Sequence, residues 1–276
     1  MKKWITIILS FMVVNYVSSQ ELQFYDFSDL STIQLNGTAV NINPNNTDVL
    51  RLTDDLYQSS SAFLVDPISL DNFASFSAAF EFQILEPQGI YDSDGQGADG
   101  LAFVIQSNSN TVGGLGGRLG YGGISNSLAI EFDTWGNNWW DLGQGNHVGV
   151  NVDGNMSSIE RVIVDERMNN GAVWTAWVDY DGMAEILEVS LSQEQSRPDN
   201  PILTTNVNLV NVLGTQEAYV GFTSGTGAAA GNHEIISLFF NDDYDPITTV
   251  VVDEPNTIVL FILGASIAIY SRKVLN

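Results

Sequence analysis

The chain has 276 residues and a formal net charge of −24, with 33 acidic residues against 9 basic ones. This balance argues against nucleic acid as a partner, because binding to phosphates requires clustered Lys and Arg. The absence of Cys excludes disulfides, thiol catalysis and Cys-ligated zinc. A hydrophobic content of 44% is sufficient for a folded core.

The N-terminus, residues 1–19, has the order of a secretory signal peptide. Two lysines open the chain, an apolar run covers residues 4–17, and two serines precede Gln20. A charged start, a short apolar middle and small residues at the cut are typical of such peptides. The apolar run is short for a membrane-spanning helix. We therefore expect the protein to be exported.

The next residues, 20–245, are predicted to form one all-β domain. Apolar and polar residues alternate with a period of two over 76–84, 174–180 and 187–191, which is typical of half-buried strands. The continuous apolar run over 101–105 suits a strand that is covered on both faces. No stretch has a convincing helical period, and many strands without helices indicate a sandwich or barrel.

A glycine-rich stretch covers residues 113–123 and is predicted to be a loop. It is not a phosphate-binding loop, because it lacks the Gly-Lys-Ser/Thr ending and no helix is expected after it.

Residues with metal-binding chemistry follow that loop. In the run from Leu128 to Asp133 the apolar side chains face the core, so Glu131 and Asp133 project from the opposite face about 6.6 Å apart. Three more potential ligands follow within a short segment: Asn137, Asp141 and His147. Carboxylate, amide and carbonyl oxygens suit Ca²⁺, and an added imidazole suits a transition metal such as Mn²⁺. The alternative is an ordinary polar loop.

The C-terminal segment, residues 254–276, follows an expected linker over 246–253. It contains Glu254-Pro255, an apolar run from Ile258 to Tyr270 and a basic end. This order resembles the PEP-CTERM sorting tail of Gram-negative bacteria, although Asp253 stands where that signature has Pro. The resemblance implies a transient membrane anchor that an exosortase-type enzyme removes, and a location at the cell surface or outside the cell. The alternative is a plain anchor helix, for which the run is short.

The segment Glu131-Phe132-Asp133-Thr134-Trp135-Gly136-Asn137, followed by Asp141 and His147-Val148-Gly149-Val150, closely resembles the metal-binding signature of legume-type (L-type) lectins. Four further stretches resemble motifs of that family in the same order: 74–77, 98–103, 116–120 and 220–224. The resemblance covers about residues 25 to 240. It implies a concanavalin A-like jelly-roll sandwich of antiparallel sheets and a non-enzymatic protein that binds carbohydrate.

The resemblance also implies two metal sites that share ligands. The transition metal, Mn²⁺ or a similar ion, would be held by Glu131, Asp133, Asp141 and His147. The calcium ion, Ca²⁺, would be held by Asp133, the main-chain oxygen of Trp135, Asn137 and Asp141.

The sugar site implied by the family lies beside these ions. Asp99 would accept hydrogen bonds from two sugar hydroxyls, and the Asn137 amide and the Gly117 N–H would donate to the sugar. The Trp135 indole would lie under the apolar face of the sugar ring. The Ala98–Asp99 peptide bond would be cis. The last specificity loop is expected at 225–232, where its small residues do not indicate which sugar is bound.

Two other functions are compatible with this sequence pattern. Glycoside hydrolases of the laminarinase type share the sandwich and use Glu-x-Asp followed by a second Glu, with carboxyls about 5–5.5 Å apart in retaining enzymes. Here Glu131-Phe132-Asp133 is followed by Thr134-Trp135-Gly136-Asn137, so the second Glu is missing. A matrix or adhesion protein could also use the fold without binding sugar. The expected partner is a glycan or exopolysaccharide, and a homodimer is possible. His233 is expected to be structural or solvent-facing rather than a ligand.

Overall fold

The computed structural model describes residues 21–111, 113–114 and 116–248. The expected signal peptide (1–19) and sorting segment (254–276) lie outside the described residues, as does part of the expected linker (246–253). In the described part of the chain, no helix has the length and apolar character needed to cross a membrane.

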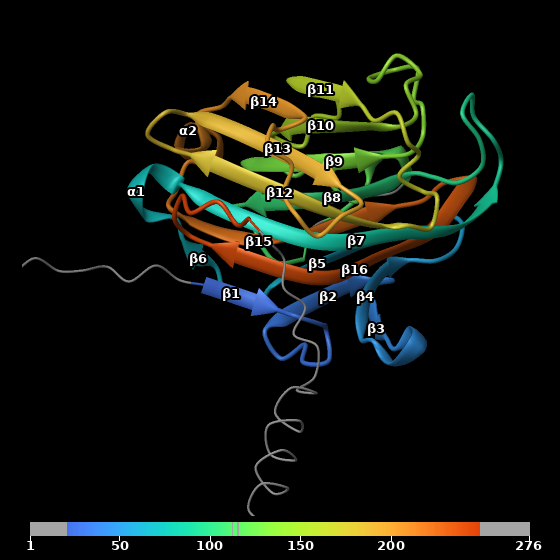
Figure 1. Ribbon diagram of the computed structural model, residues 1–276, viewed down its shortest axis with the longest axis horizontal. Helices are drawn as coiled ribbons and strands as arrows, with labels where there is room; N and C mark the ends of the chain where they lie inside the picture. Colours follow the sequence, from blue (N-terminus) through green and yellow to red (C-terminus); the bar gives the residue numbers. More distant parts are fainter. Residues whose placement is uncertain (1–20, 112, 115, 249–276) are drawn as a thin grey trace, which may run out of the picture.

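The described chain forms two antiparallel sheets, stacked as a sandwich (Figure 1). One sheet, which we name the back sheet, has the order β14 (Leu203–Asn206), β13 (Ile186–Ser192), β12 (Val173–Asp181), β7 (Phe76–Gly89), β16 (Ala229–Asn241), β4 (Val49–Thr53) and β3 (Val40–Ile42), with β1 (Glu21–Phe24) also paired to β16. The other, which we name the front sheet, has the order β11 (Glu160–Ile163), β10 (His147–Val152), β9 (Ser127–Asp133), β8 (Gly100–Gln106), β15 (Glu217–Gly225), β5 (Ser59–Leu64) and β2 (Ile33–Gly37), with β6 (Ile68–Ser69) also paired to β15. This architecture confirms the predicted antiparallel jelly-roll sandwich.

The helices of the described residues are single turns: η1 (Pro44–Asn46), α1 (Asp71–Ala74), η2 (Gly116–Arg118) and α2 (Leu209–Leu213). Helix α2 begins after Asn208, whose side chain accepts a hydrogen bond from the Asn211 N–H, and ends at Gly214 in the left-handed region. Elements this short cannot show a 3.6-residue hydrophobic period, which explains why the sequence did not predict them.

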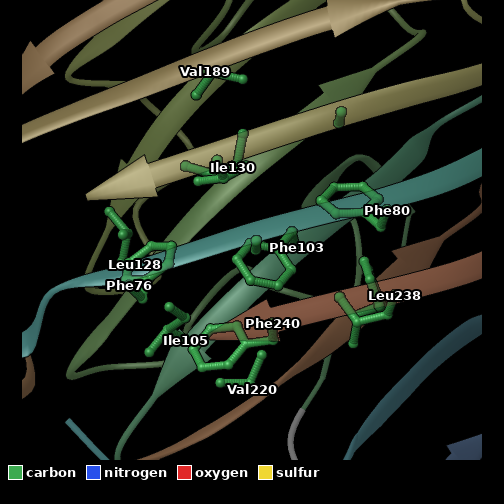
Figure 2. Close-up of a cluster of buried hydrophobic side chains, with 14 of the residues drawn as sticks. Phe76, Phe80, Phe103, Ile105, Leu128, Ile130, Val189, Val220, Leu238 and Phe240 are labelled. Atoms are coloured by element: carbon green, nitrogen blue, oxygen red, sulfur yellow. The ribbon is translucent and has the colours of Figure 1, made fainter. Parts of the chain in front are cut away.

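The core lies between the two sheets and is rich in phenylalanine (Figure 2). Phe80 on β7 is the centre of this cluster, and its ring centroid is 5.1 Å from that of Phe222 and 5.4 Å from that of Phe103 on the front sheet. Phe82 contacts Phe132 with ring centroids 4.9 Å apart. Every second residue of β7 from Phe76 to Ile84 belongs to this core, as the alternation predicted. Such aromatic pairs stabilise the sandwich beyond their buried area.

The outer face of the back sheet is covered by the chain itself. Trp177 lies on that face and is fully buried, with Ile247 packed against it. Asp179, two residues along the same strand, forms an ion pair with Arg197. The sequence alternation places these residues correctly on the face opposite the core but does not predict that they are buried, because the covering segments are distant in sequence.

Candidate functional site

Two neighbouring strands of the front sheet, β9 and β10, bring three of the predicted metal ligands together. Asp133 on β9 is directly opposite His147 on β10, and Glu131 is directly opposite Gly149. Residues opposite each other in an antiparallel pair point to the same face of the sheet. Ligand atoms of Glu131, Asp133 and His147 all lie within 4.8 Å of one another, and the three residues are buried. The predicted grouping of these three is therefore present.

The space for the Glu131 carboxylate exists because residue 149 is a glycine. A Cβ at this position would lie 2.4 Å from Oε1 of Glu131 and 2.6 Å from Oγ of Ser158. Both distances are far below van der Waals contact. Gly149 therefore contributes to the site because its missing side chain leaves space for the Glu131 carboxylate. The family motif over residues 147–150 includes this glycine.

Hydrogen bonds fix the orientation of Glu131 and His147. Ser158 donates to Oε1 of Glu131 at 2.6 Å, and the Asn151 amide donates to Oε2 at 2.5 Å. Nδ1 of His147 lies 2.9 Å from the Gln144 carbonyl oxygen. Since that oxygen can only accept, Nδ1 carries the proton, and Nε2 of a neutral imidazole faces the cluster with its lone pair. This is the arrangement that metal-binding histidines adopt.

Asp133 is a buried carboxylate beside other acidic groups. Burial raises its pKa well above the usual value, and the nearby charges of Glu131, Asp141 and Asp99 raise its pKa further. Its Oδ1 accepts a hydrogen bond from the Trp135 N–H at 2.7 Å. Several acidic groups that oppose one another's ionisation can be ionised together only if a cation compensates them. The donor set therefore fits a bound metal ion.

Asp141 lies outside the tight group of three but closes the neighbouring loop. Its Oδ2 accepts from the Asn137 N–H at 2.7 Å and its Oδ1 from the Gly143 N–H at 2.9 Å. Burial raises its pKa, and the hydrogen bonds from the Asn137 and Gly143 N–H groups oppose that shift. Both carboxylate oxygens of Asp141 therefore accept from the backbone of the loop, and the structure does not bring Asp141 into the group of Glu131, Asp133 and His147.

Asp99 lies at the start of β8 with an unsatisfied carboxylate. The Ala98–Asp99 peptide bond is cis, as the family resemblance implies. Asp99 is only 4% exposed, yet its Oδ2 has no hydrogen-bond partner. Burial raises the pKa of Asp99 to about 7. The main-chain oxygen of Asp99 accepts from the Thr134 N–H at 2.8 Å, which joins this residue to the end of β9.

Asn137 and Gly117 meet beside this carboxylate-rich region. Oδ1 of Asn137 is buried without a hydrogen-bond partner. A Cβ at Gly117 would lie 2.4 Å from that oxygen, so the glycine backbone packs directly on the amide. Trp135, two residues before Asn137, is half-buried rather than part of the core. Unsatisfied polar groups in such a place are available to a ligand.

The sequence did not predict the contact between Asp92 and the metal-binding loop. Oδ2 of Asp92 accepts from the Gly136 N–H at 2.9 Å, and Oδ1 accepts from the Asp94 and Gly95 N–H groups at 3.2 Å and 3.1 Å. The acidic, glycine-containing segment signals a turn. Nothing local to it indicates that the turn reaches a residue in the loop after β9.

The loop between β15 and β16 is shorter than the specificity loop expected at 225–232. β15 ends at Gly225 and β16 begins at Ala229, so only residues 226–228 connect them. A turn between β4 and β5 supports this short connection, because the Tyr57 N–H donates to the Gly227 oxygen at 3.0 Å. Gly227 in turn lies near Asp99, since a Cβ there would be 3.6 Å from Oδ2.

His233 has a structural role, which is one of the two alternatives expected for it. It is fully buried, and its Nδ1 lies 2.6 Å from Oγ1 of Thr53. Burial lowers the pKa of His233 to about 3. The histidine therefore stays neutral in the folded protein.

Comparison with known proteins identifies relatives of this sandwich. A family model described as the legume lectin domain matches residues 19–253. Lectin 1 of Laburnum alpinum is 31% identical over 232 residues, which are 80% of this chain and 89% of the relative. The L-type lectin-domain containing receptor kinase VIII.1 of Arabidopsis thaliana is 32% identical over 178 residues, or 62% of this chain. The chain spans only 24% of that kinase.

Solved structures of lectins have the same fold. The lectin of Bauhinia forficata, solved with GalNAc, superposes with a TM-score of 0.67 at 24% identity and covers 81% of this chain and 98% of its own. The metal-free form of lectin I-B4 from Griffonia simplicifolia has a TM-score of 0.65 at 29% identity, with 80% and 98% covered. The motifs, the sandwich and the family match agree, and the chain belongs to the legume lectin family.

Proposed function

We propose that the protein is a metal-dependent lectin that binds a glycan at Asp99, Gly117, Trp135 and Asn137. One observation carries this proposal: the buried, unpartnered oxygens of Asp99 and Asn137 lie beside a buried cluster of carboxylates and an imidazole. Asp99 accepts hydrogen bonds from sugar hydroxyls, while the Asn137 amide nitrogen and the Gly117 N–H donate. The half-buried Trp135 indole offers an apolar plane to the C–H face of the ring.

The metal ions have separate tasks in this proposal. Ca²⁺ would use oxygen ligands only, from Asp133, the Trp135 main chain, Asn137 and Asp141. Mn²⁺ or another transition metal would use Glu131, Asp133, Asp141 and His147, because its ligand set includes an imidazole. Bound cations supply the positive charge that lets these carboxylates ionise together. They also hold the Asn137 side chain in the loop beside the sugar site.

Sugar-bound structures of related lectins support a saccharide as the ligand. The Bauhinia forficata lectin was solved with GalNAc and lectin UEA-II with galactose. We propose a glycan or exopolysaccharide as the partner, met at the cell surface or outside the cell after export through residues 1–19. The C-terminal segment would act as a transient membrane anchor that an exosortase-type enzyme processes.

A hydrolase function is disfavoured by the burial of the carboxylates. Glu131 and Asp133 are each 1% exposed, whereas a glycosidase needs two carboxyls flanking an accessible glycosidic bond. Their hydrogen bonds also point to structural partners: Ser158 and Asn151 for Glu131, and the Trp135 backbone for Asp133.

We also propose that a homodimer, if formed, does not use Trp177 directly, because this side chain is fully buried within the chain, with Ile247 packed against its cluster.

A glycan array with and without EDTA tests the proposed function. We expect binding that disappears on chelation and returns with Ca²⁺ or with Ca²⁺ and Mn²⁺ together. Binding that survives EDTA would contradict metal dependence. Release of a shortened glycan would indicate a hydrolase, and adhesion that persists in Asp99→Ala without glycan binding would indicate a matrix protein.

A further inference from the structure

A pocket lies directly beside the proposed sugar site and is not used by it. Its volume is about 360 Å³, which is within the usual range of about 300–1,000 Å³ for small-molecule sites. It is lined by Arg118, the residue after Gly117, and by Trp139 and Trp140, which precede Asp141. The turn after β10, including Asn155 to Ser157, completes the lining. The pocket therefore adjoins both loops that would hold the first sugar residue.

Trp139 has no role in the core. It is 87% exposed, the highest exposure among the large hydrophobic residues of the described chain. Trp140, by contrast, packs on the cluster that includes Tyr121, Ile124 and Met156, and Arg161 holds its main-chain oxygen at 3.2 Å. An anchored indole at the wall and a free indole at the rim give a sugar ring an aromatic surface to lie against.

Among the arginines of the described residues, Arg118 is the one whose guanidinium forms no hydrogen bond or ion pair with the protein. Arg51, Arg167 and Arg197 form ion pairs with carboxylates. Arg161 donates to a main-chain oxygen. The stem of Arg118 lies along Gly122, where a Cβ would be 2.8 Å from the arginine Cβ.

The pocket also lacks any acidic lining residue. That is notable in a chain with 33 acidic residues and a net charge of −24. An uncommitted guanidinium offers a planar pair of donors that matches a carboxylate. Charge complementarity therefore favours a negatively charged ligand here over a neutral one.

We propose that this pocket binds a carboxylate-bearing sugar residue, of the uronic acid type, next to the residue held at Asp99. Arg118 pairs with the sugar carboxylate, and Trp139 covers an apolar face of the same ring. The inference rests on the proposed function, because the pocket takes the neighbouring residue of the same glycan. It assigns the substrate class as an acidic saccharide.

The test compares acidic oligosaccharides with counterparts in which the uronic acid has been reduced to the neutral hexose. Binding is measured on an array and by calorimetry with Ca²⁺ and Mn²⁺ present. We expect the wild-type protein to bind its best acidic ligand at least tenfold more tightly than the reduced counterpart. Arg118→Gln should remove that preference and leave the affinity for the reduced counterpart and for monosaccharides within twofold. Arg118→Lys should keep part of the preference for the acidic ligand.

Two further variants separate the explanations. Asn46→Asp on the β3–β4 turn makes the same change of one negative charge as Arg118→Gln, at an exposed residue of the other sheet, and should keep the acidic preference. Trp139→Ala should weaken both the acidic and the reduced oligosaccharide and spare monosaccharides. The pocket assignment is overturned if monosaccharides bind but no acidic ligand exceeds its reduced counterpart, or if Arg118→Gln keeps the preference. If the wild-type protein bound no saccharide at all, the proposed function itself would be overturned.

Discussion

Nε2 of His147 lies 3.2 Å from Oε1 of Glu131, and the hydrogen bond of Nδ1 to the Gln144 oxygen leaves that Nε2 with a lone pair when the ring is neutral. Two acceptors then face each other in a buried site. Such a contact is favourable only with a proton or a cation between them. The geometry of this pair is thus the most direct indication that the cluster is built around a positive charge.

The first prediction concerns that pair. His147→Ala should lower the affinity for Mn²⁺ by at least tenfold, because the imidazole is the one nitrogen ligand of the proposed set. Ca²⁺, which would use oxygen ligands, should lose less affinity. Titration calorimetry with each ion measures the difference. His233→Gln, which changes the other histidine of the chain, is the control and should leave both affinities unchanged. An unaltered Mn²⁺ affinity in His147→Ala would rule out this ligand assignment.

Asp99→Asn is expected to separate stability from function. The folded-state pKa of Asp99, about 7, lies above its usual value of 3.8 because the carboxyl is buried. A raised carboxyl pKa stabilises the fold below about pH 4 and this contribution is lost as the pH rises through 7. In EDTA at pH 8, Asp99→Asn should therefore be more stable than the wild type by about 2–4 kcal/mol, and at pH 4 the two should be equal.

Sugar binding should be abolished in the same Asp99→Asn variant, since the amide has one acceptor oxygen where the carboxylate has two, and its NH2 group presents donors in place of the second. Urea melts at the two pH values and a glycan array measure both effects. A variant that is no more stable than the wild type at pH 8 would show that Asp99 is not held charged at a cost in the folded protein.

The core strands follow from local patterns in the sequence, because the alternation in β7 and β9 identifies the core side chains. The grouping of Glu131, Asp133 and His147 was implied by the family motif, and the structure brings them together on adjacent strands. Interactions that join distant segments were not predictable in this way. Ser158 reaches Glu131 across 27 residues and Asp92 reaches Gly136 across 44. Neither has a periodic signal, because each contact joins a loop to a segment that is distant in sequence.

Acid should destabilise the fold through His233. Burial lowers its folded-state pKa to about 3, below the usual 6.5. The unfolded chain therefore takes up a proton that the folded protein does not, so the stabilising contribution is complete above about pH 6.5 and declines towards pH 3. The slope is about 1.4 kcal/mol per pH unit. Between pH 7 and pH 5 in EDTA, the wild type should lose about 2 kcal/mol more stability than His233→Gln.

The difference between the two proteins isolates His233 from the buried carboxylates, whose raised pKa values act in the opposite direction and are common to both. Denaturant melts at four pH values measure the two curves. Parallel curves would mean that His233 is protonated in the folded protein as readily as in the unfolded chain.

Gly149→Ala should damage the metal site without touching a ligand. The added methyl would lie 2.4 Å from Oε1 of Glu131 and 2.6 Å from Oγ of Ser158, so the carboxylate must leave its place and lose its hydrogen bond to Ser158. We expect a loss of about 1–3 kcal/mol in unfolding free energy and a metal affinity reduced by at least tenfold. The increase in melting temperature that Ca²⁺ and Mn²⁺ confer on the wild type should shrink accordingly, because ligand stabilisation follows the affinity.

Gly123→Ala is a matched glycine control: no atom lies within 4 Å of its added Cβ, although its positive φ of 94° carries a conformational cost. Suppose that Gly149→Ala and Gly123→Ala both retained the full metal-dependent increase in melting temperature. The close fit of the strand against the Glu131 carboxylate would then not govern metal binding.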